Sequence, residues 1–117
     1  MLDLSLLVCT KNSSKSIISC LESSLPILKE NAELVLVDGR SQDNTIELIK
    51  DFLNQNKIVN FKIINQPKAG LYQAFNLAIE NATRTKTFFL HSDDVLKSCD
   101  TLIRDIHHSN ADVIFYG

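Results

Sequence analysis

Two apolar patterns alternate along this chain, and their alternation is its most restrictive feature. Short continuous apolar runs give way repeatedly to stretches in which apolar residues recur every three or four positions. Continuous runs predict strands that are buried on both faces, and the wider spacing predicts amphipathic helices. Strands that alternate with helices are typical of a parallel sheet covered on both sides. We therefore predict an α/β fold with three layers, α/β/α, around a mainly parallel sheet.

The boundaries of the predicted elements follow from the same patterns. Strands are predicted over residues 4–9, 33–38, 59–65, 86–90 and 112–116. Helices are predicted from about residue 14 to a bend or end at Pro26, and over residues 44–55, 71–82 and 98–108. Asp43 and Ser98 precede two of these helices and are predicted N-caps. A chain of 117 residues suits one domain, so we expect residues 1–117 to form a single unit.

Composition excludes several classes of function. The net charge is -2 and the basic residues are scattered, so no nucleic-acid partner is expected. The three cysteines form no C-x-x-C pair, which argues against a zinc knuckle or a disulfide framework. No long apolar stretch is present, so we expect a cytoplasmic location, with membrane association at the cytoplasmic face left open.

Polar residues follow three of the predicted strands. The first strand leads into Thr10 and Asn12, the second ends in Asp38, and the fourth leads into residues 91–94. In open parallel sheets, ligands bind outside the carboxyl ends of the strands. These residues are therefore expected to share one edge of the sheet and to form the candidate site.

Adjacent acids at positions 93 and 94 are the sharpest signal at this edge. Asp93 and Asp94 repel each other unless a cation or a donor lies between them, and a hard divalent ion prefers such oxygen ligands. A cation held by one or two carboxylates commonly completes its shell with substrate phosphates. The alternative is that both residues cap the following turn, which aspartate does readily.

Asp38 and Gly70 also have two interpretations each. Asp38 either accepts hydrogen bonds from a nucleotide base or ribose, or bonds the backbone of the turn over residues 39–41. Gly70 precedes the third predicted helix, where it either provides a positive φ or close backbone approach, or is an ordinary loop glycine.

Glycine-rich phosphate-binding loops are missing from the sequence. The stretch Cys9-Thr-Lys-Asn-Ser-Ser after the first strand contains no glycine, and neither a Walker A pattern nor a G-x-S-x-G elbow occurs. Any bound phosphates would therefore be held through a metal ion.

These segments together resemble the inverting family 2 glycosyltransferases with the GT-A fold. The resemblance covers nearly the whole chain in the family's order, through LSLLVCTKN, ELVLVDGRSQDNT, AGLYQAFNLAI, FFLHSDD and ADVIFYG. The chain departs from the family pattern at Lys11, where an aromatic residue is common. It also departs at His91, where the first acid of the D-x-D-type run usually stands, so a contact between His91 and the donor is left open.

This resemblance implies a nucleoside-diphosphate-sugar transferase fold and a donor site. The implied nucleotide-sugar-binding residues are Thr10, Asn12, Asp38, Gly70 and Asp93. A divalent metal, Mn²⁺ or Mg²⁺, is implied at Asp93, with Asp94 beside it. Thr10 and Asp38 would hold the base and ribose.

The implied reaction transfers a sugar from a nucleoside-diphosphate sugar to a hydroxyl of a glycan or lipid-linked acceptor, in polysaccharide or cell-surface glycan synthesis. In this family the general base and acceptor pocket lie in the second half of the domain, so the catalytic base is expected to lie outside this chain. We therefore expect these 117 residues alone to bind nucleotide weakly and to turn over little.

Two other classes of protein are alternatives. One is a non-catalytic nucleotide-binding or interaction domain derived from such an enzyme, and self-association through an open sheet edge fits either class. The other is a receiver-like module, but that class places paired acids after the first strand, where this chain has Lys11 and Asn12.

Overall fold

A parallel sheet forms the centre of the protein. The computed structural model describes residues 3–67, 70–96 and 113–115. Within these residues, five strands lie in the order β3-β2-β1-β4-β5, and every neighbouring pair is parallel. Their bounds are β1 Leu4–Thr10, β2 Glu33–Asp38, β3 Phe61–Asn65, β4 Lys86–His91 and β5 Val113–Phe115. The predicted mainly parallel sheet is confirmed.

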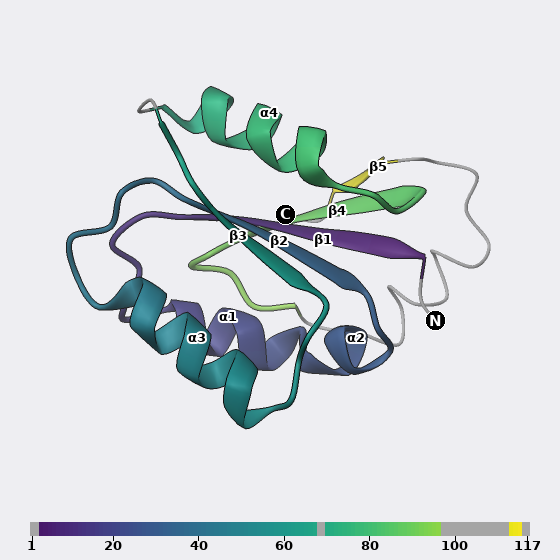
Figure 1. Ribbon diagram of the computed structural model, residues 1–117, viewed down its shortest axis with the longest axis horizontal. Coiled ribbons are helices and arrows are strands. Elements are labelled where there is room, and N and C mark those ends of the chain that lie inside the picture. The colour runs from purple at the N-terminus through teal and green to yellow at the C-terminus, as the bar shows by residue number, and fades with distance from the viewer. Residues whose placement is uncertain (1–2, 68–69, 97–112, 116–117) are drawn as a thin grey trace.

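Helices cover both faces of this sheet (Figure 1). The helices are α1 Ile17–Ser23, α2 Leu25–Lys29, α3 Thr45–Gln55 and α4 Leu71–Asn81. Figure 1 shows α1, α2 and α3 on one face and α4 on the other. The predicted three-layer α/β/α arrangement is therefore confirmed, and the predicted helix over residues 98–108 lies outside the described residues.

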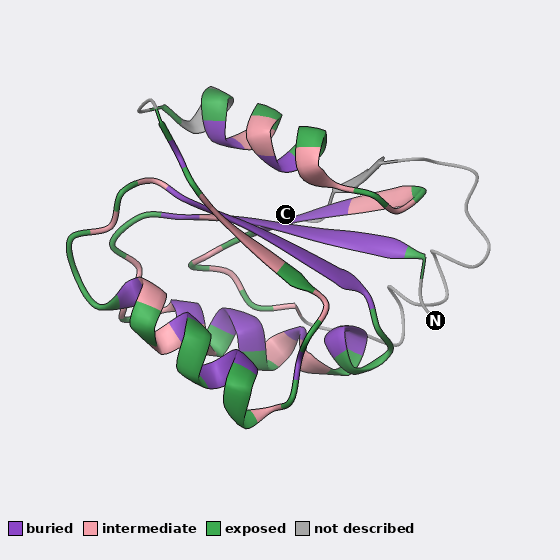
Figure 2. Ribbon diagram, viewed as in Figure 1, coloured by how far each residue is buried: buried purple, intermediate pink, exposed green. Residues whose placement is uncertain are grey.

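Alternate residues of the central strands face different helices. One buried cluster joins Leu6 and Val8 to residues of α1 and α3, and a second joins Leu7 and Val35 to Ala78 of α4. Figure 2 shows β1 and β2 buried along most of their length. Each fully buried aliphatic side chain contributes roughly 1.5–3 kcal/mol, so the continuous apolar runs fix which strands occupy the centre.

Pro26 lies in the first turn of a second helix, which differs from the predicted bend or end of the first one. Helix α1 ends at Ser23, and Pro26 lies in the first turn of the separate helix α2. Proline suits this position because the first turn of a helix leaves its N–H groups without intrahelical partners. The first helix begins at Ile17, later than expected, and is preceded by a turn in which Ser13 O accepts hydrogen bonds from the N–H groups of Ser16 and Ile17.

The predicted N-cap Asp43 is one residue too early. The N-cap of α3 is Asn44, which makes no side-chain capping bond. Asp43 Oδ1 instead accepts the N–H of Thr45 at 3.1 Å and also bonds the Thr45 hydroxyl.

The third strand begins two residues later than predicted, at Phe61 rather than Val59. Val59 is 83% exposed and takes no part in the sheet.

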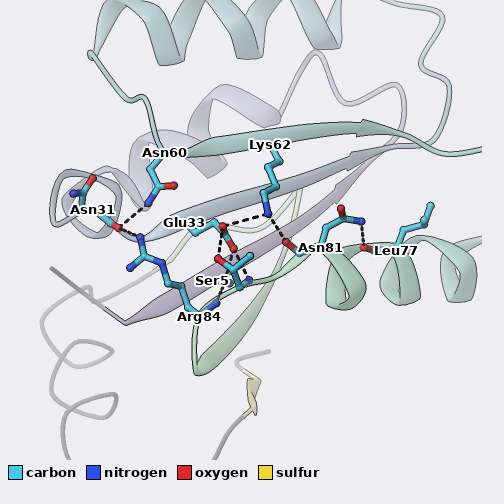
Figure 3. A network of polar contacts seen from close by, with 9 residues as sticks. Ser5, Asn31, Glu33, Asn60, Lys62, Leu77, Asn81 and Arg84 are labelled. Carbon is cyan, nitrogen blue, oxygen red and sulfur yellow. Dashed lines mark hydrogen bonds and ion pairs between the residues drawn. The ribbon is translucent and has the colours of Figure 1, made fainter.

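A buried carboxylate joins the strands at their amino ends (Figure 3). Glu33 is 4% exposed and accepts hydrogen bonds from Ser5 Oγ at 2.8 Å, Thr83 N at 2.9 Å and Thr83 Oγ1 at 2.7 Å. Lys62 Nζ lies 3.5 Å from Glu33 Oε2. Burial raises the pKa of Glu33, but the bonds from Thr83 and Ser5 and the charge of Lys62 together hold that pKa below its ordinary value.

Among the residues that the structure describes, no helix combines the length and the apolar content that crossing a bilayer requires.

Candidate functional site

The carboxyl ends of the strands bring the predicted site residues to one edge of the sheet. Thr10 of β1 pairs in register with Asp38 of β2, which pairs with Asn65 of β3. On the other side of β1, Cys9 pairs with His91 at the end of β4. Polar residues that are far apart in the sequence therefore lie along one rim, as the sequence predicted.

Thr10 carries a buried hydroxyl without a partner. The residue is 4% exposed, and its Oγ1 forms no hydrogen bond to any part of the chain that the structure describes. Its backbone carbonyl accepts the N–H of Gly39 at 2.8 Å, which fixes the backbone at this point. An unpaired buried hydroxyl is destabilising, so such a group at a strand end is available to a ligand.

Asp38 shapes the loop that follows β2. The side chain is 3% exposed, its Oδ2 accepts the N–H of Ser41 at 3.0 Å, and its Oδ1 accepts the Ser41 hydroxyl at 2.6 Å. The turn-forming interpretation is therefore observed. A second role toward a nucleotide stays a prediction, and each carboxylate oxygen can accept more than one hydrogen bond.

Asn12 joins the loop after β1 to the loop after β2. Its N–H donates to Ser41 Oγ at 2.8 Å, and its Oδ1 accepts the N–H of Gln42 at 2.7 Å. The backbone of Asn12 has a φ of 48°, which asparagine tolerates better than most residues. The exposed residue Asn12 thus holds the loops after β1 and β2 together. Its contact with a nucleotide sugar stays a prediction.

Gly70 provides the positive φ that the sequence suggested. Its φ is 121° and its ψ is 136°, at the N-cap of α4. Gly70 O accepts Gln66 Nε2 at 2.7 Å, and the N–H of Gln66 donates to Asp38 O at 2.8 Å. The loop before α4 is thereby attached to the end of β2.

Sequence reasoning missed Gln66 and Arg40, which connect the same loops. Gln66 is 5% exposed although it is polar, and Arg40 Nε donates to Gln66 O at 3.1 Å. Arg40 Nη2 also bonds Pro67 O, and Arg40 has a φ of 63°. The position of Gln66 directly after a strand was a signal, but polar residues at strand ends are common and do not reveal their partners.

Asp93 and Asp94 lie in a turn directly after β4. The N–H of Asp94 donates to His91 O at 3.0 Å, Asp93 is exposed, and Asp94 is half-buried. Neither carboxylate forms a hydrogen bond with a described residue, so the turn-capping interpretation has no observed contact there. Among those residues no set of three His, Cys, Asp or Glu side chains gathers to hold a metal. Two carboxylates still fit a hard cation whose other ligands are phosphate oxygens.

Cys20 lies beneath this turn as a protonated thiol. Burial, with smaller contributions from the charges of Asp94 and Asp93, raises the pKa of Cys20 to about 12. Burial alone raises the pKa of Cys9 to about 11. The Cys20 thiol therefore keeps its proton, which it donates to His91 O at 3.4 Å.

His91 ends β4 with an exposed ring. The ring lies edge-on to Phe75 of α4, with centroids 6.2 Å apart and an interplanar angle of 70°. Beyond it, Ser92 Oγ lies 2.8 Å from Ser13 Oγ, so the turn that contains Asp93 and Asp94 is bonded to the segment after β1. The segments that follow β1, β2, β3 and β4 are thus connected into one continuous rim.

The sequence and fold of this chain match a known family. The family model for glycosyl transferase family 2 matches residues 5–117. The chain belongs to this family. The nucleotide-sugar transferase fold of the GT-A type that the resemblance implied is therefore confirmed.

Relatives of this family 2 chain are considerably longer. It is 32% identical over 114 residues to the glycosyltransferase GlyG of Streptococcus pneumoniae serotype 4, covering 95% of this chain and 37% of GlyG. S. aureus TarS 1–349 in complex with UDP superposes with a TM-score of 0.74 at 27% identity, over 89% of this chain and 31% of TarS. The mannosyltransferase PcManGT of Pyrobaculum calidifontis, in complex with GDP-Man and Mn²⁺, has a TM-score of 0.78 at 20% identity, over 89% and 31%.

Proposed function

We propose that this chain is the donor-binding part of a glycosyltransferase that transfers a sugar from a nucleoside-diphosphate sugar to an acceptor hydroxyl. The main support is Thr10, whose buried hydroxyl has no hydrogen-bond partner among the described residues. Thr10 pairs in register with Asp38 at the carboxyl edge of the sheet, in a chain of family 2. Ligands of open parallel sheets bind at this edge. The solved structure of TarS 1–349 in complex with UDP, which shares this fold, supports a nucleotide as the ligand.

Thr10 and Asp38 are proposed to hold the base and ribose of the donor. The Thr10 hydroxyl can both donate and accept a hydrogen bond, whereas Asp38 can only accept. Asn12 and Gly70 are proposed to act mainly through the loops that they shape around the nucleotide. Their hydrogen bonds to Gln42 and Gln66 fix those loops before a ligand arrives.

Asp93 and Asp94 are proposed to hold Mn²⁺ or Mg²⁺ together with the diphosphate. When bound, such a cation stabilises negative charge on the leaving diphosphate. The exposure of Asp93 and the absence of hydrogen bonds to both carboxylates among the described residues support this assignment. A solved structure of the same fold, PcManGT, contains Mn²⁺.

The acceptor is proposed to be a glycan or a lipid-linked glycan, as in polysaccharide or cell-surface glycan synthesis. The base that deprotonates its hydroxyl is proposed to lie outside these residues. This chain spans only 37% of the length of GlyG, so the reaction is proposed for the complete catalytic unit.

A thermal-shift screen tests the proposed donor site. The purified chain is heated with UDP, GDP, CDP and dTDP sugars, each with and without Mn²⁺. We expect one nucleotide class to raise the melting temperature only when Mn²⁺ is present, because a ligand that binds the folded state stabilises it. Failure of every nucleotide to stabilise the chain, with or without the metal, would favour a non-catalytic interaction domain.

A further inference from the structure

The acidic turn, residues 91–96, is attached to α1 at its first residue. Cys20 of α1 is fully buried, and its thiol donates to His91 O at 3.4 Å. The same carbonyl accepts the N–H of Asp94 at 3.0 Å. One carbonyl therefore receives both the hydrogen bond that closes the turn and the bond that joins the turn to the helix.

The acidic turn is also attached to α1 at its last residue. The N–H of Leu96 donates to Ser23 Oγ at 2.8 Å, and the Ser23 hydroxyl donates to Cys20 O at 2.7 Å. The Leu96 side chain packs against the buried cluster that contains Cys20. One turn of α1 thus contacts both ends of the acidic turn.

A third attachment lies between those two ends. Ser92 Oγ lies 2.8 Å from Ser13 Oγ, and Ser13 precedes α1 in the loop that leaves the candidate site. Ser13 Oγ also donates to Lys11 O at 3.2 Å, so the serine pair is connected to the segment after β1. The two carboxylates of the turn lie between the attachments at residues 92 and 96.

We propose that α1 and its preceding loop fix the position of Asp93 and Asp94, with Ser13, Cys20 and Ser23 as positioning residues. This inference rests on the proposed metal-diphosphate role of the two acids. Their carboxylates repel each other and have no hydrogen bonds of their own within the described residues. Among the described residues, the attachments of the turn through His91, Ser92 and Leu96 are what hold the two acids in place before a cation binds. A ligand set that is already in place binds more tightly.

Mn²⁺ titration followed by nuclear magnetic resonance tests this inference. Paramagnetic Mn²⁺ broadens the amide signals of residues near its site, and the concentration dependence gives the affinity. The variants Ser13→Ala and Ser23→Ala should each bind Mn²⁺ about threefold to tenfold more weakly, as expected when one modest hydrogen bond is lost. Ser23→Thr retains the hydroxyl and should restore the affinity.

Ser16→Ala is the matched control. Ser16 lies between the two tested serines, is half-buried like Ser13, and makes no side-chain capping bond, so its loss should leave the affinity unchanged. Because Ser13 also bonds Lys11, Ser92→Ala tests the serine pair alone and should weaken Mn²⁺ binding as well. The Ser13→Ala/Ser92→Ala double variant should bind Mn²⁺ no more weakly than Ser13→Ala alone, since both substitutions remove the same contact.

The possible outcomes separate this inference from the proposed function. Mn²⁺ broadening around residues 93 and 94 in the wild type, weakened in the Ser13 and Ser23 variants at an unchanged melting temperature, supports the positioning role. Wild-type broadening that those variants leave unchanged overturns the positioning role and leaves the proposed function standing. A wild type without any localised broadening overturns the positioning role, while the thermal-shift screen with nucleotide and Mn²⁺ still decides the proposed function.

Discussion

Thr10 and Asp38 are paired in register at the carboxyl ends of the neighbouring strands β1 and β2, and both residues are almost fully buried. Asp38 uses both carboxylate oxygens to bind Ser41, whereas the Thr10 hydroxyl has no partner among the described residues. The same edge therefore holds one polar group that builds the loop and one that remains available. In the proposed donor site, Asp38 would both shape the loop and accept hydrogen bonds from the donor, whereas the Thr10 hydroxyl would bond the donor alone.

Replacing Thr10 by valine should separate ligand binding from stability. Valine keeps the shape and removes a hydroxyl that lacks a partner, so the free energy of unfolding in urea should stay the same or rise. Nucleotide affinity should fall about threefold to tenfold, as for one lost hydrogen bond. Thr10→Ser is the control that keeps the hydroxyl and the affinity. A clear loss of stability in Thr10→Val would show that the hydroxyl has a structural partner.

Gly70→Ala should destabilise the fold through backbone conformation. A Cβ at this position would meet only Gln73 Cγ at 3.8 Å, so space is available, but a φ of 121° is strained for any other residue. We expect a loss of about 1–3 kcal/mol in urea denaturation. The control Asn76→Ala, at an exposed position of α4, the helix that Gly70 precedes, should change stability by less than about 0.5 kcal/mol. Equal stability of Gly70→Ala and the wild type would be inconsistent with this backbone geometry.

Glu33→Gln should weaken the network at the amino ends of the strands. The amide group of glutamine would face donors from Ser5, Thr83 and Lys62, so one or more charge-assisted bonds is lost. The expected loss is about 2–3 kcal/mol, measured by urea denaturation at neutral pH. Glu80→Gln, at an exposed position of α4, serves as the control and should unfold like the wild type.

Acid should remove the contribution of Glu33 in a defined range of pH. The pKa of Glu33 in the folded chain lies below its ordinary value of 4.5, so its stabilisation is fully present above that pH. The stabilisation is lost as the pH falls from 4.5 through the lowered pKa, because the unfolded chain then takes up the proton more readily. Denaturation at several pH values should show a smaller acid-induced loss for Glu33→Gln than for the wild type, and identical slopes would contradict the assignment.

The positions of the central strands along the chain could be predicted from the sequence. The continuous apolar runs at β1 and β2 indicate strands that are buried between two layers. Because the strands are parallel, Thr10 and Asp38 at their carboxyl ends lie on one edge. Pro26 was misread because proline suits both a helix end and a first helical turn, and only the packing of α2 distinguishes them.

The connections within the rim could not be predicted. Ser13 and Ser92 are 79 positions apart, and nothing in two common serines indicates that their hydroxyls meet. Gln66 was missed because its burial depends on the loop that Arg40 holds in place. Such contacts follow from the geometry of several loops at once, which residue spacing does not encode.

The role of Asp93 is the central claim, and calorimetry on Asp93→Asn tests it most directly. The nucleotide that gives the largest thermal shift is titrated into wild type, Asp93→Asn and the control Asp51→Asn, which lies at an exposed position of α3. Wild type and Asp51→Asn should bind with Mn²⁺ and not without it, whereas Asp93→Asn should lose this dependence together with most of its affinity. Equal, Mn²⁺-dependent binding by Asp93→Asn would contradict the account.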